Sequence, residues 1–296
     1  MTKAGYIAIV GRPNVGKSTL LNALLGEKIA IVSAKPQTTR NRIVGILTRT
    51  DAQFIFVDTP GMHRPQNSLG DFMMETAKSS MIEADAVILM VDPGKPVTKV
   101  EENVITYLKQ SGVPAVLALN KTDLYNAAEI AECIKSYAAL HDFAAVVPIC
   151  AKNGKLVDAL LSECEALLSE SPFFFPEDMI TDQPERQMAA EIIREKLLRT
   201  LNKEIPHGIA VVIEEFKDED TLIRIRAEIF CEKASHKGII VGKNGAELKR
   251  VGTYAREDLE KLFGTKVYLN LWVKVKANWR ESEQIVSNFG YQQDEE

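Results

Sequence analysis

Residues 11–18 read Gly11-Arg12-Pro13-Asn14-Val15-Gly16-Lys17-Ser18. An apolar run at residues 6–10 precedes this stretch, and Thr19 opens a run of helix-forming residues that reaches residue 25. Between a strand and a helix, glycines of this spacing let backbone N–H groups face anionic oxygens, the lysine adds a positive charge, and the serine hydroxyl can bind Mg²⁺. The stretch therefore predicts a phosphate-binding loop in an α/β domain, with an ordinary glycine-rich turn as the alternative.

A second polar motif follows the apolar run at residues 113–119, which is typical of a parallel strand buried on both faces. It consists of Asn120, Lys121, Thr122 and Asp123. The Asp123 carboxylate can accept hydrogen bonds from N1–H and the 2-amino group of guanine, whereas adenine offers no such donor pair and would leave a buried aspartate unpaired. The motif therefore predicts guanine as the bound base. A polar loop that merely ends a strand is the alternative.

A third motif ends the predicted strand at residues 53–57 and reads Asp58, Thr59, Pro60 and Gly61. The Asp58 carboxylate can reach Mg²⁺ through water, and the N–H of Gly61 can reach a γ-phosphate.

Hydroxyl groups lie between the first and third motifs, in the loop of residues 36–40. Either Thr38 or Thr39 can complete the Mg²⁺ coordination when the γ-phosphate is present. We therefore expect this loop to be ordered in one nucleotide state and relaxed in the other.

A fifth element, Cys150-Ala151-Lys152, follows a predicted strand at residues 145–149. Its position suits a backbone N–H that contacts guanine O6.

Length and composition limit the classes of protein. The 296 residues suit two domains, 46% of them are hydrophobic, and the net charge of −5 gives no overall nucleic-acid signal. The four cysteines have no metal-ligand or redox spacing, which is typical of reduced thiols in a cytosolic protein. We expect no cleavable signal and no transmembrane segment, and we expect a cytoplasmic monomer. A peripheral contact with the inner face of the cell membrane stays open.

Strand-like and helix-like segments alternate from residue 5 to about residue 168, with helices expected at 102–110, 127–140 and 156–168. This spacing indicates a mostly parallel sheet covered on both faces, and we assign residues 1–170 to a GTPase domain. Three prolines interrupt the pattern afterwards, so we assign residues 171–187 to a linker. The phenylalanines at 173–175 are expected to dock on one of the domains, with a functional hydrophobic patch as the alternative.

The pattern changes to α-β-β-α-α-β in residues 188–280, which we assign to a type II KH domain, and residues 281–296 form a tail with a frayed tip. The expected elements are a helix at 188–201, strands at 208–216 and 223–231, a helix at 246–263 and a strand at 267–275. Between the second strand and the long helix, a helix and a glycine-rich turn can hold nucleic-acid backbone against helix N-termini. The turn contains Gly238, Ile239, Ile240, Val241, Gly242, Lys243, Asn244 and Gly245.

Positive charge concentrates around this turn, although the chain as a whole is acidic. Residues 233–280 contain eleven lysines and arginines, including Lys249 and Arg250, but only four acidic residues. We expect this cluster to contact RNA phosphates, and single-stranded RNA to be favoured because its bases are free to be read.

The five nucleotide elements in this order, followed by a KH domain, resemble the Era-like family of translation-factor-class GTPases. The resemblance covers nearly the whole chain. It implies that the chain binds GTP, GDP and Mg²⁺, that Thr39 rather than Thr38 is the Mg²⁺ ligand, and that Lys17, Thr39 and Gly61 serve catalysis. Relatives commonly carry serine where this chain has Cys150, and the expected contact there runs through the backbone.

Hydrolysis itself is less well equipped than binding. Ras-like enzymes orient the attacking water with a glutamine, but Met62 holds that place here. The resemblance implies a group of enzymes with a hydrophobic residue at this position, so we expect slow intrinsic hydrolysis. Potassium-activated relatives hold K⁺ with an asparagine at the position of Asn14, and the alternative is that Asn14 only accommodates the loop backbone.

Together, the two domains predict a GTP-dependent switch coupled to an RNA clamp. The resemblance implies a target near the 3′ end of 16S ribosomal RNA and a role in small (30S) ribosomal subunit assembly and rRNA processing. The alternatives are an RNA-modification GTPase and a nucleotide-gated RNA chaperone with negligible turnover. We expect a GTP analogue to tighten RNA binding relative to GDP.

Overall fold

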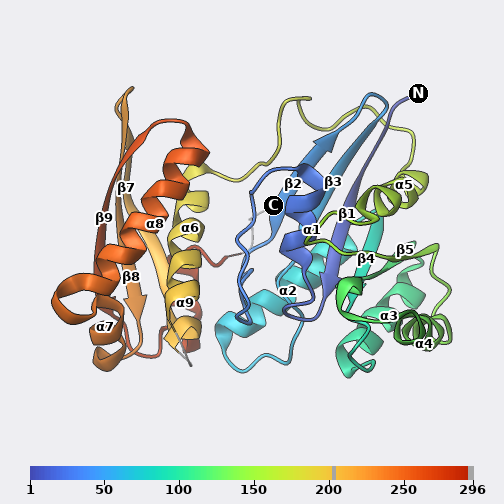
Figure 1. Ribbon diagram of the computed structural model, residues 1–296, viewed down its shortest axis with the longest axis horizontal. Coiled ribbons are helices and arrows are strands. Elements are labelled where there is room, and N and C mark those ends of the chain that lie inside the picture. Colours follow the sequence, from blue (N-terminus) through green and yellow to red (C-terminus); the bar gives the residue numbers. More distant parts are fainter. Residues whose placement is uncertain (202–204, 293–296) are drawn as a thin grey trace. The chain divides into compact units, whose positions relative to one another are not determined.

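The computed structural model describes residues 1–201 and 205–292 and divides into two compact units (Figure 1). The first unit comprises Met1–Ala30, Thr39–Arg64 and Met73–Asp182. The second comprises Ile31–Thr38, Pro65–Phe72 and the chain from Gln183 onward. Two short segments that are near the nucleotide motifs in sequence therefore belong to the second unit. The tip of the predicted tail, residues 293–296, lies outside the described residues.

A six-stranded sheet forms the centre of the first unit, in the order β2-β3-β1-β4-β5-β6. All neighbouring strands are parallel except β2 and β3, which confirms the mostly parallel sheet. Every residue of β4 is buried, as expected for a parallel strand covered on both faces. The strands are β1 Lys3–Gly11, β2 Ile43–Thr48, β3 Ala52–Asp58, β4 Ala86–Val91, β5 Ala115–Leu119 and β6 Ala145–Pro148.

Helices follow most of these strands, as βαβ crossovers require. They are α1 Lys17–Leu25, α2 Ser68–Ile82, α3 Lys99–Ser111, the short η1 Thr122–Leu124, α4 Ala127–Ala138 and α5 Val157–Leu167. Apolar side chains of α2, α3 and α4 form one core with β1, β4 and β5, while α1 packs against α5. The observed bounds of α3, α4 and α5 lie within three residues of those expected, and α2 was not among the predicted helices.

The phenylalanine run docks on the first unit. The buried side chain of Gln53 on β3 holds its backbone, because Oε1 accepts the N–H groups of Phe174 and Phe175 at 2.8 and 3.0 Å. The ring of Phe174 stacks on Tyr6 at 5.8 Å, and Phe175 packs on an apolar cluster of β2 and β3. The run therefore fixes the exit of the chain from this unit.

The second unit has the α-β-β-α-α-β order that the sequence predicts (Figure 1). Its three-stranded sheet has the order β7-β8-β9, with β7 antiparallel and β9 parallel to β8. Its elements are α6 Glu185–Thr200, η2 Ile205–Gly208, β7 Ala210–Asp218, β8 Leu222–Cys231, α7 Ala234–Val241, η3 Lys243–Gly245, α8 Ala246–Phe263, β9 Lys266–Val275, η4 Trp279–Glu281 and α9 Glu283–Asn288.

The core of this unit lies between the sheet and helices α6, α7 and α8. The chain after β9 also packs on this unit: Trp279 is fully buried and donates from Nε1 to the carbonyl of Gly208 at 2.9 Å. In residues 1–201 and 205–292 we find no helix that combines the length and the apolar character needed to cross a membrane.

Candidate functional site

The predicted phosphate loop joins β1 to α1, and its backbone adopts the left-handed conformations that its glycines allow. Gly16 has φ 111° and Asn14 has φ 62°. A Cβ atom at Gly16 would collide with the side-chain amide of Asn120, so only glycine fits there. Thr19 lies in the first turn of α1, which starts at Lys17. The loop thus has the strand–loop–helix setting that phosphate binding requires.

Lys17 is buried beside this loop, where its ammonium group donates to the carbonyls of Gly11 and Arg12, each at 3.2 Å. Burial lowers the pKa of Lys17 to about 8, and the nearby carboxylate of Asp58 opposes this shift. The arrangement keeps a cation at the loop that an anionic phosphate would stabilise.

Three oxygen atoms from three motifs converge next to Lys17. The hydroxyl of Ser18 lies 2.6 Å from Asp58 Oδ2 and 2.8 Å from the hydroxyl of Thr39, which itself lies 3.2 Å from Asp58 Oδ2. Burial raises the pKa of Asp58, and its Oδ1 is buried with no hydrogen-bond partner among the described residues. Oxygen ligands of this kind, with one orphaned carboxylate oxygen, fit Mg²⁺.

The structure distinguishes the two candidate threonines. Thr39 faces Ser18 and Asp58, whereas the hydroxyl of Thr38 donates to the carbonyl of Lys35 at 2.7 Å. Of the two threonines, only Thr39 thus has its hydroxyl beside Ser18 and Asp58 among the described residues.

Asn120 ties three of the predicted motifs together. Its buried Nδ2 donates to the carbonyl of Val15 at 2.8 Å, and its Oδ1 accepts the N–H of Ala151 at 2.9 Å. Thr122 adds a bond from its hydroxyl to the carbonyl of Ile149 at 2.9 Å. Buried polar groups with complete hydrogen bonding fix a unique arrangement, so this side chain holds the phosphate loop in register with the base-reading loops.

Two details of the base-reading loops differ from the sequence argument. Asp123 is exposed rather than buried, so its discrimination against adenine requires the base itself to cover it, and its Oδ1 accepts from the Cys150 thiol at 3.1 Å. The N–H of Ala151, the backbone donor expected to contact guanine O6, donates to Asn120 Oδ1 at 2.9 Å. Lys152 is exposed, and Lys121 pairs with Asp92 at 3.0 Å.

The third motif lies directly against the phosphate loop. A Cβ at Gly61 would collide with the backbone of Pro13, and the Thr59 hydroxyl donates to the carbonyl of Ile9 at 2.8 Å. Pro60, which lies between Thr59 and Gly61 in the sequence, is buried. The Met62 side chain packs into the apolar core. A buried thioether cannot orient water, so Met62 cannot take the role of the glutamine in Ras-like enzymes.

Sequence reasoning missed the partner of Arg12. The guanidinium forms an ion pair with Glu101, a fully buried carboxylate in the first turn of α3 that also accepts the N–H of Thr98 at 3.0 Å. A glutamate three residues after a threonine reads as a helix cap, and nothing in the sequence signals its second role.

The predicted clamp of the second unit lies between α7 and α8. Gly242, Asn244 and Gly245 have φ values of 72°, 52° and 78°, so the turn is tight and left-handed. Ile239 is 52% exposed and faces solvent, whereas Ile240 is fully buried in the core. The Ile240 side chain therefore packs in the core below the turn. We predicted that Ile240 contacts RNA, and its burial corrects this prediction for the side chain.

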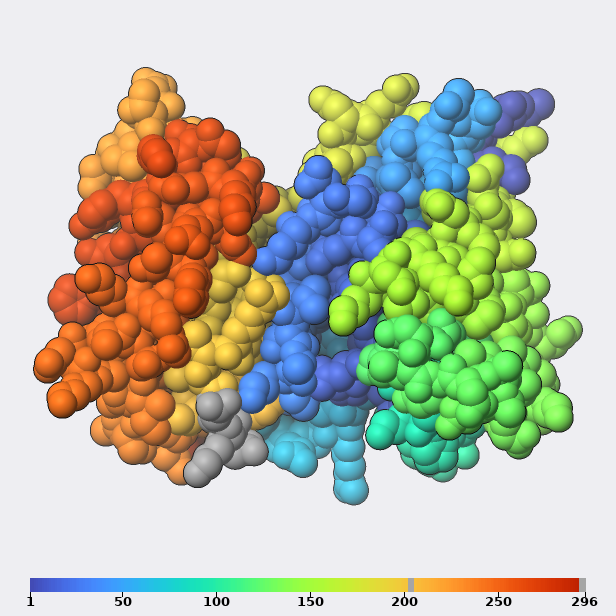
Figure 2. Space-filling view, in the orientation of Figure 1, coloured from blue at the N-terminus to red at the C-terminus, as the bar shows by residue number. Residues whose placement is uncertain are grey.

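The residues of this turn belong to the orange part of the surface in the space-filling view (Figure 2). Lys243, Lys249 and Arg250 are exposed, and Arg250 pairs with Glu247 at 2.6 Å. Elsewhere in the cluster Arg280 and Lys274 form ion pairs with acidic neighbours on β8 and at its end. Lys237 in α7 is a further exposed cation next to the turn.

The fold and the two sites define a class: a GTPase with a phosphate-binding loop, followed by a KH domain. Comparisons agree, since residues 6–121 match the family described as 50S ribosome-binding GTPase and residues 204–280 match the KH domain family.

The chain belongs to the Era family of GTPases. It is 49% identical to GTPase Era of Clostridium kluyveri, an alignment that covers 98% of this chain and 100% of the relative. GTPase Era of Ruminiclostridium cellulolyticum is 48% identical, with coverage of 98% and 97%. A crystal structure of Era in complex with MgGDPNP and nucleotides 1506–1542 of 16S ribosomal RNA is similar with a TM-score of 0.96 and 41% identity, covering 99% of this chain and 100% of that chain. A variant of Aquifex aeolicus Era bound to GDP·AlF4⁻ gives a TM-score of 0.95 at 42% identity, with the same coverage.

Proposed function

We propose that this GTPase is a switch in which the bound nucleotide controls an RNA clamp, and that its target is ribosomal RNA near the 3′ end of 16S rRNA during small-subunit assembly. The observation that carries the proposal is the meeting of Ser18, Thr39 and Asp58, because it brings the switch loop to the phosphate loop. The relative solved with 16S rRNA and MgGDPNP supports the choice of RNA.

The residues have separate tasks in this proposal. Backbone N–H groups of the phosphate loop, except at Pro13, which has none, would bind the phosphates together with the Lys17 ammonium. The N–H of Gly61, which lies against Pro13 of this loop, would contact the γ-phosphate. Ser18, Thr39 and Asp58 would hold Mg²⁺, which when bound neutralises charge on the β- and γ-phosphates. Asp123 selects guanine. After hydrolysis the γ-phosphate that favours the bound position of Thr39 is gone, and the loop that carries Thr39 relaxes.

The test is a titration of a single-stranded 16S 3′-end RNA into protein loaded with GDP or with a non-hydrolysable GTP analogue at fixed salt. Coupling free energies between sites are commonly of order 1–3 kcal/mol, so the analogue should tighten RNA binding by about tenfold. Equal affinity in the two states would remove the proposal.

We further propose that Asn14 holds a K⁺ ion beside the phosphates. Its exposed position at the phosphate loop supports this assignment, and its left-handed φ of 62° allows a control that keeps the backbone. Asn14→Gly keeps the backbone conformation and removes the amide. We expect turnover to be faster in KCl than in NaCl and the variant to lose that difference; equal turnover of the wild type in both salts would contradict it.

We also propose that the protein acts in the cytoplasm as a monomer, since its proposed target is the ribosomal subunit. Co-sedimentation with anionic vesicles tests the remaining idea of a peripheral membrane contact, and sedimentation velocity tests the monomer.

A further inference from the structure

Helix α6 buries three consecutive charged residues: Arg194, Glu195 and Lys196 are 1%, 0% and 6% exposed. Buried charges are costly unless they are paired and hydrogen-bonded, so their partners show what the helix holds. The guanidinium of Arg194 is neutralised by Glu191, with 2.8 Å between Nε and Oε1. Burial lowers the pKa of Arg194, but the Glu191 carboxylate outweighs it and raises the pKa overall.

The main-chain partners of Arg194 and Glu195 lie on the segment Ile31–Thr38, which belongs to the same compact unit. Arg194 donates to the main-chain carbonyls of Thr38 and, at 3.4 Å, of Gln37. Gln37 has φ 58°, a left-handed conformation that persists in a non-glycine residue when its surroundings enforce it. The C-terminal end of the segment is therefore held through its backbone, directly before Thr39.

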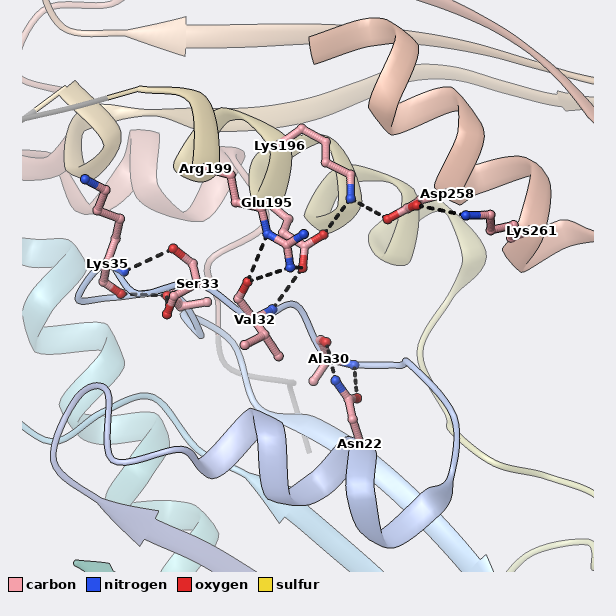
Figure 3. A network of polar contacts seen from close by, with 11 residues as sticks. Asn22, Ala30, Val32, Ser33, Lys35, Glu195, Lys196, Arg199, Asp258 and Lys261 are labelled. Atoms are coloured by element: carbon pink, nitrogen blue, oxygen red, sulfur yellow. Dashed lines mark hydrogen bonds and ion pairs between the residues drawn. The ribbon is translucent and has the colours of Figure 1, made fainter. Parts of the chain in front are cut away.

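The other end of the segment is held by the same helix (Figure 3). Glu195 Oε1 accepts the N–H of Val32 at 3.1 Å, and Arg199 donates to the carbonyl of Val32 at 3.1 Å. Ala30, just before the segment, is bound through both main-chain groups to Asn22 of α1 at 2.9 and 2.8 Å. These bonds engage backbone atoms, so they fix the path of the chain whatever its side chains.

A second branch of the network leads from α6 to α8 (Figure 3). The Lys196 ammonium lies between two carboxylates, Glu195 Oε2 at 2.8 Å and Asp258. Helix α8 begins at Ala246, directly after the glycine turn of the RNA clamp. One carboxylate oxygen of Glu195 thus accepts a hydrogen bond from residues 31–38, and the other is linked through Lys196 to Asp258 on α8.

We propose that Arg194 and Glu195 are positioning residues for GTP hydrolysis and for its coupling to RNA binding. They hold residues 31–38 against α6 and thereby position Thr39. The ion pair of Lys196 with Asp258 connects Glu195 to α8. The inference rests on the proposed GTP-controlled RNA clamp and names the residues that carry the control. When residues 31–38 detach from α6, the buried side chains of Arg194 and Glu195 lose main-chain hydrogen-bond partners. This cost favours a two-state attachment of the segment to α6 over a gradual one.

The experiment compares Glu195→Gln and Asp258→Asn with the control Glu257→Gln, an exposed charge on α8 next to Asp258. Asp258 is partly exposed, so its variant keeps the test valid if Glu195→Gln fails to fold. Two quantities are measured: the ratio of RNA dissociation constants in the GDP state and with a non-hydrolysable GTP analogue, and kcat and KM for GTP.

In Glu195→Gln and Asp258→Asn the ratio should fall by roughly three- to tenfold, since mutations along a coupling network commonly have effects of this size. The control should keep the wild-type ratio. Glu195→Gln should also lower kcat by a similar factor with KM unchanged, a split that a merely destabilised protein would not show. The double variant should lose no more coupling than Glu195→Gln alone, because both changes interrupt one network.

Variants that fold and keep the wild-type ratio and kcat would overturn this inference while the proposed function stands. A wild-type ratio of one would instead overturn the proposed function, and the inference with it.

Discussion

The nucleotide site and the RNA clamp are built in opposite ways. The nucleotide site collects residues from 11 to 152 and locks them with buried side-chain bonds, above all those of Asn120 to Val15 and Ala151. The clamp is a local turn of left-handed residues with exposed lysines around it. Single side chains should therefore matter greatly at the first site, whereas the clamp should spread its binding energy over many groups.

The largest effect is expected from Asn120→Ala. This change leaves the Val15 carbonyl and the Ala151 N–H without their partner, and each unsatisfied buried group costs about 1–3 kcal/mol, so GTP should bind roughly a hundredfold more weakly. Calorimetry measures the affinity. Asn153→Ala, at an exposed loop position whose Oδ1 accepts the local N–H of Lys155, is the matched control and should bind GTP normally.

Next in size is a pair of glycine substitutions that sets the two regions side by side. Gly16→Ala adds a collision with Asn120 to a left-handed φ, and should weaken GTP binding by about 2 kcal/mol or more. Gly245→Ala also places alanine at a positive φ, here 78° against 111° at Gly16, but no atom lies within 4 Å of the added Cβ, so the change should destabilise the protein by only about 1 kcal/mol. Similar losses at both positions would show that the clamp is as tightly built as the nucleotide site.

The lysines of the clamp should have smaller, distributed effects. If Lys243 and Lys249 each contact one phosphate, the double alanine variant should reduce the slope of log affinity against log salt by about 1.4, since each contact to single-stranded nucleic acid contributes about 0.7. Fluorescence titrations between 50 and 300 mM KCl, about the range in which such slopes are read, provide the measurement. Lys109→Ala on α3 is the control, and a slope unchanged in the clamp variant would exclude these contacts.

The smallest effect concerns a buried thiol in the first unit. Burial raises the pKa of Cys164 on α5 to about 12. Because the unfolded thiol ionises near its ordinary value of about 8.5 and the folded thiol does not, stability falls as pH rises from there toward the folded value. Between pH 7.5 and 8.5 the loss is about 0.4 kcal/mol, measurable by urea denaturation. Cys164→Ala should lack this part of the pH dependence; an identical dependence would contradict it.

The sequence was most informative where a motif and its function lie close together in the chain. The bounds of α8 and the left-handed Gly242-to-Gly245 turn follow from local glycine and apolar spacing. The strands with nucleotide motifs at their ends were likewise predictable, because fully apolar runs between polar loops indicate parallel strands.

What the sequence did not reveal depends on partners distant along the chain. The apolar stripe of α6 predicts an amphipathic helix, yet Arg194, Glu195 and Lys196 are buried too, because residues 31–38 and Asp258 provide their partners. The pairing of Arg12 with Glu101 and the contact of Ala151 with Asn120 were hidden for the same reason. No periodicity encodes which distant group meets a charged side chain.

The most direct test of coupling between the two regions is reciprocal. Thermodynamic linkage requires RNA to raise the affinity for the GTP analogue, relative to GDP, by the same factor by which the analogue raises the affinity for RNA. Competition titrations of both nucleotides with and without saturating RNA measure that factor, and we predict about tenfold in favour of the analogue. An RNA-independent preference would contradict the account of a nucleotide-controlled clamp.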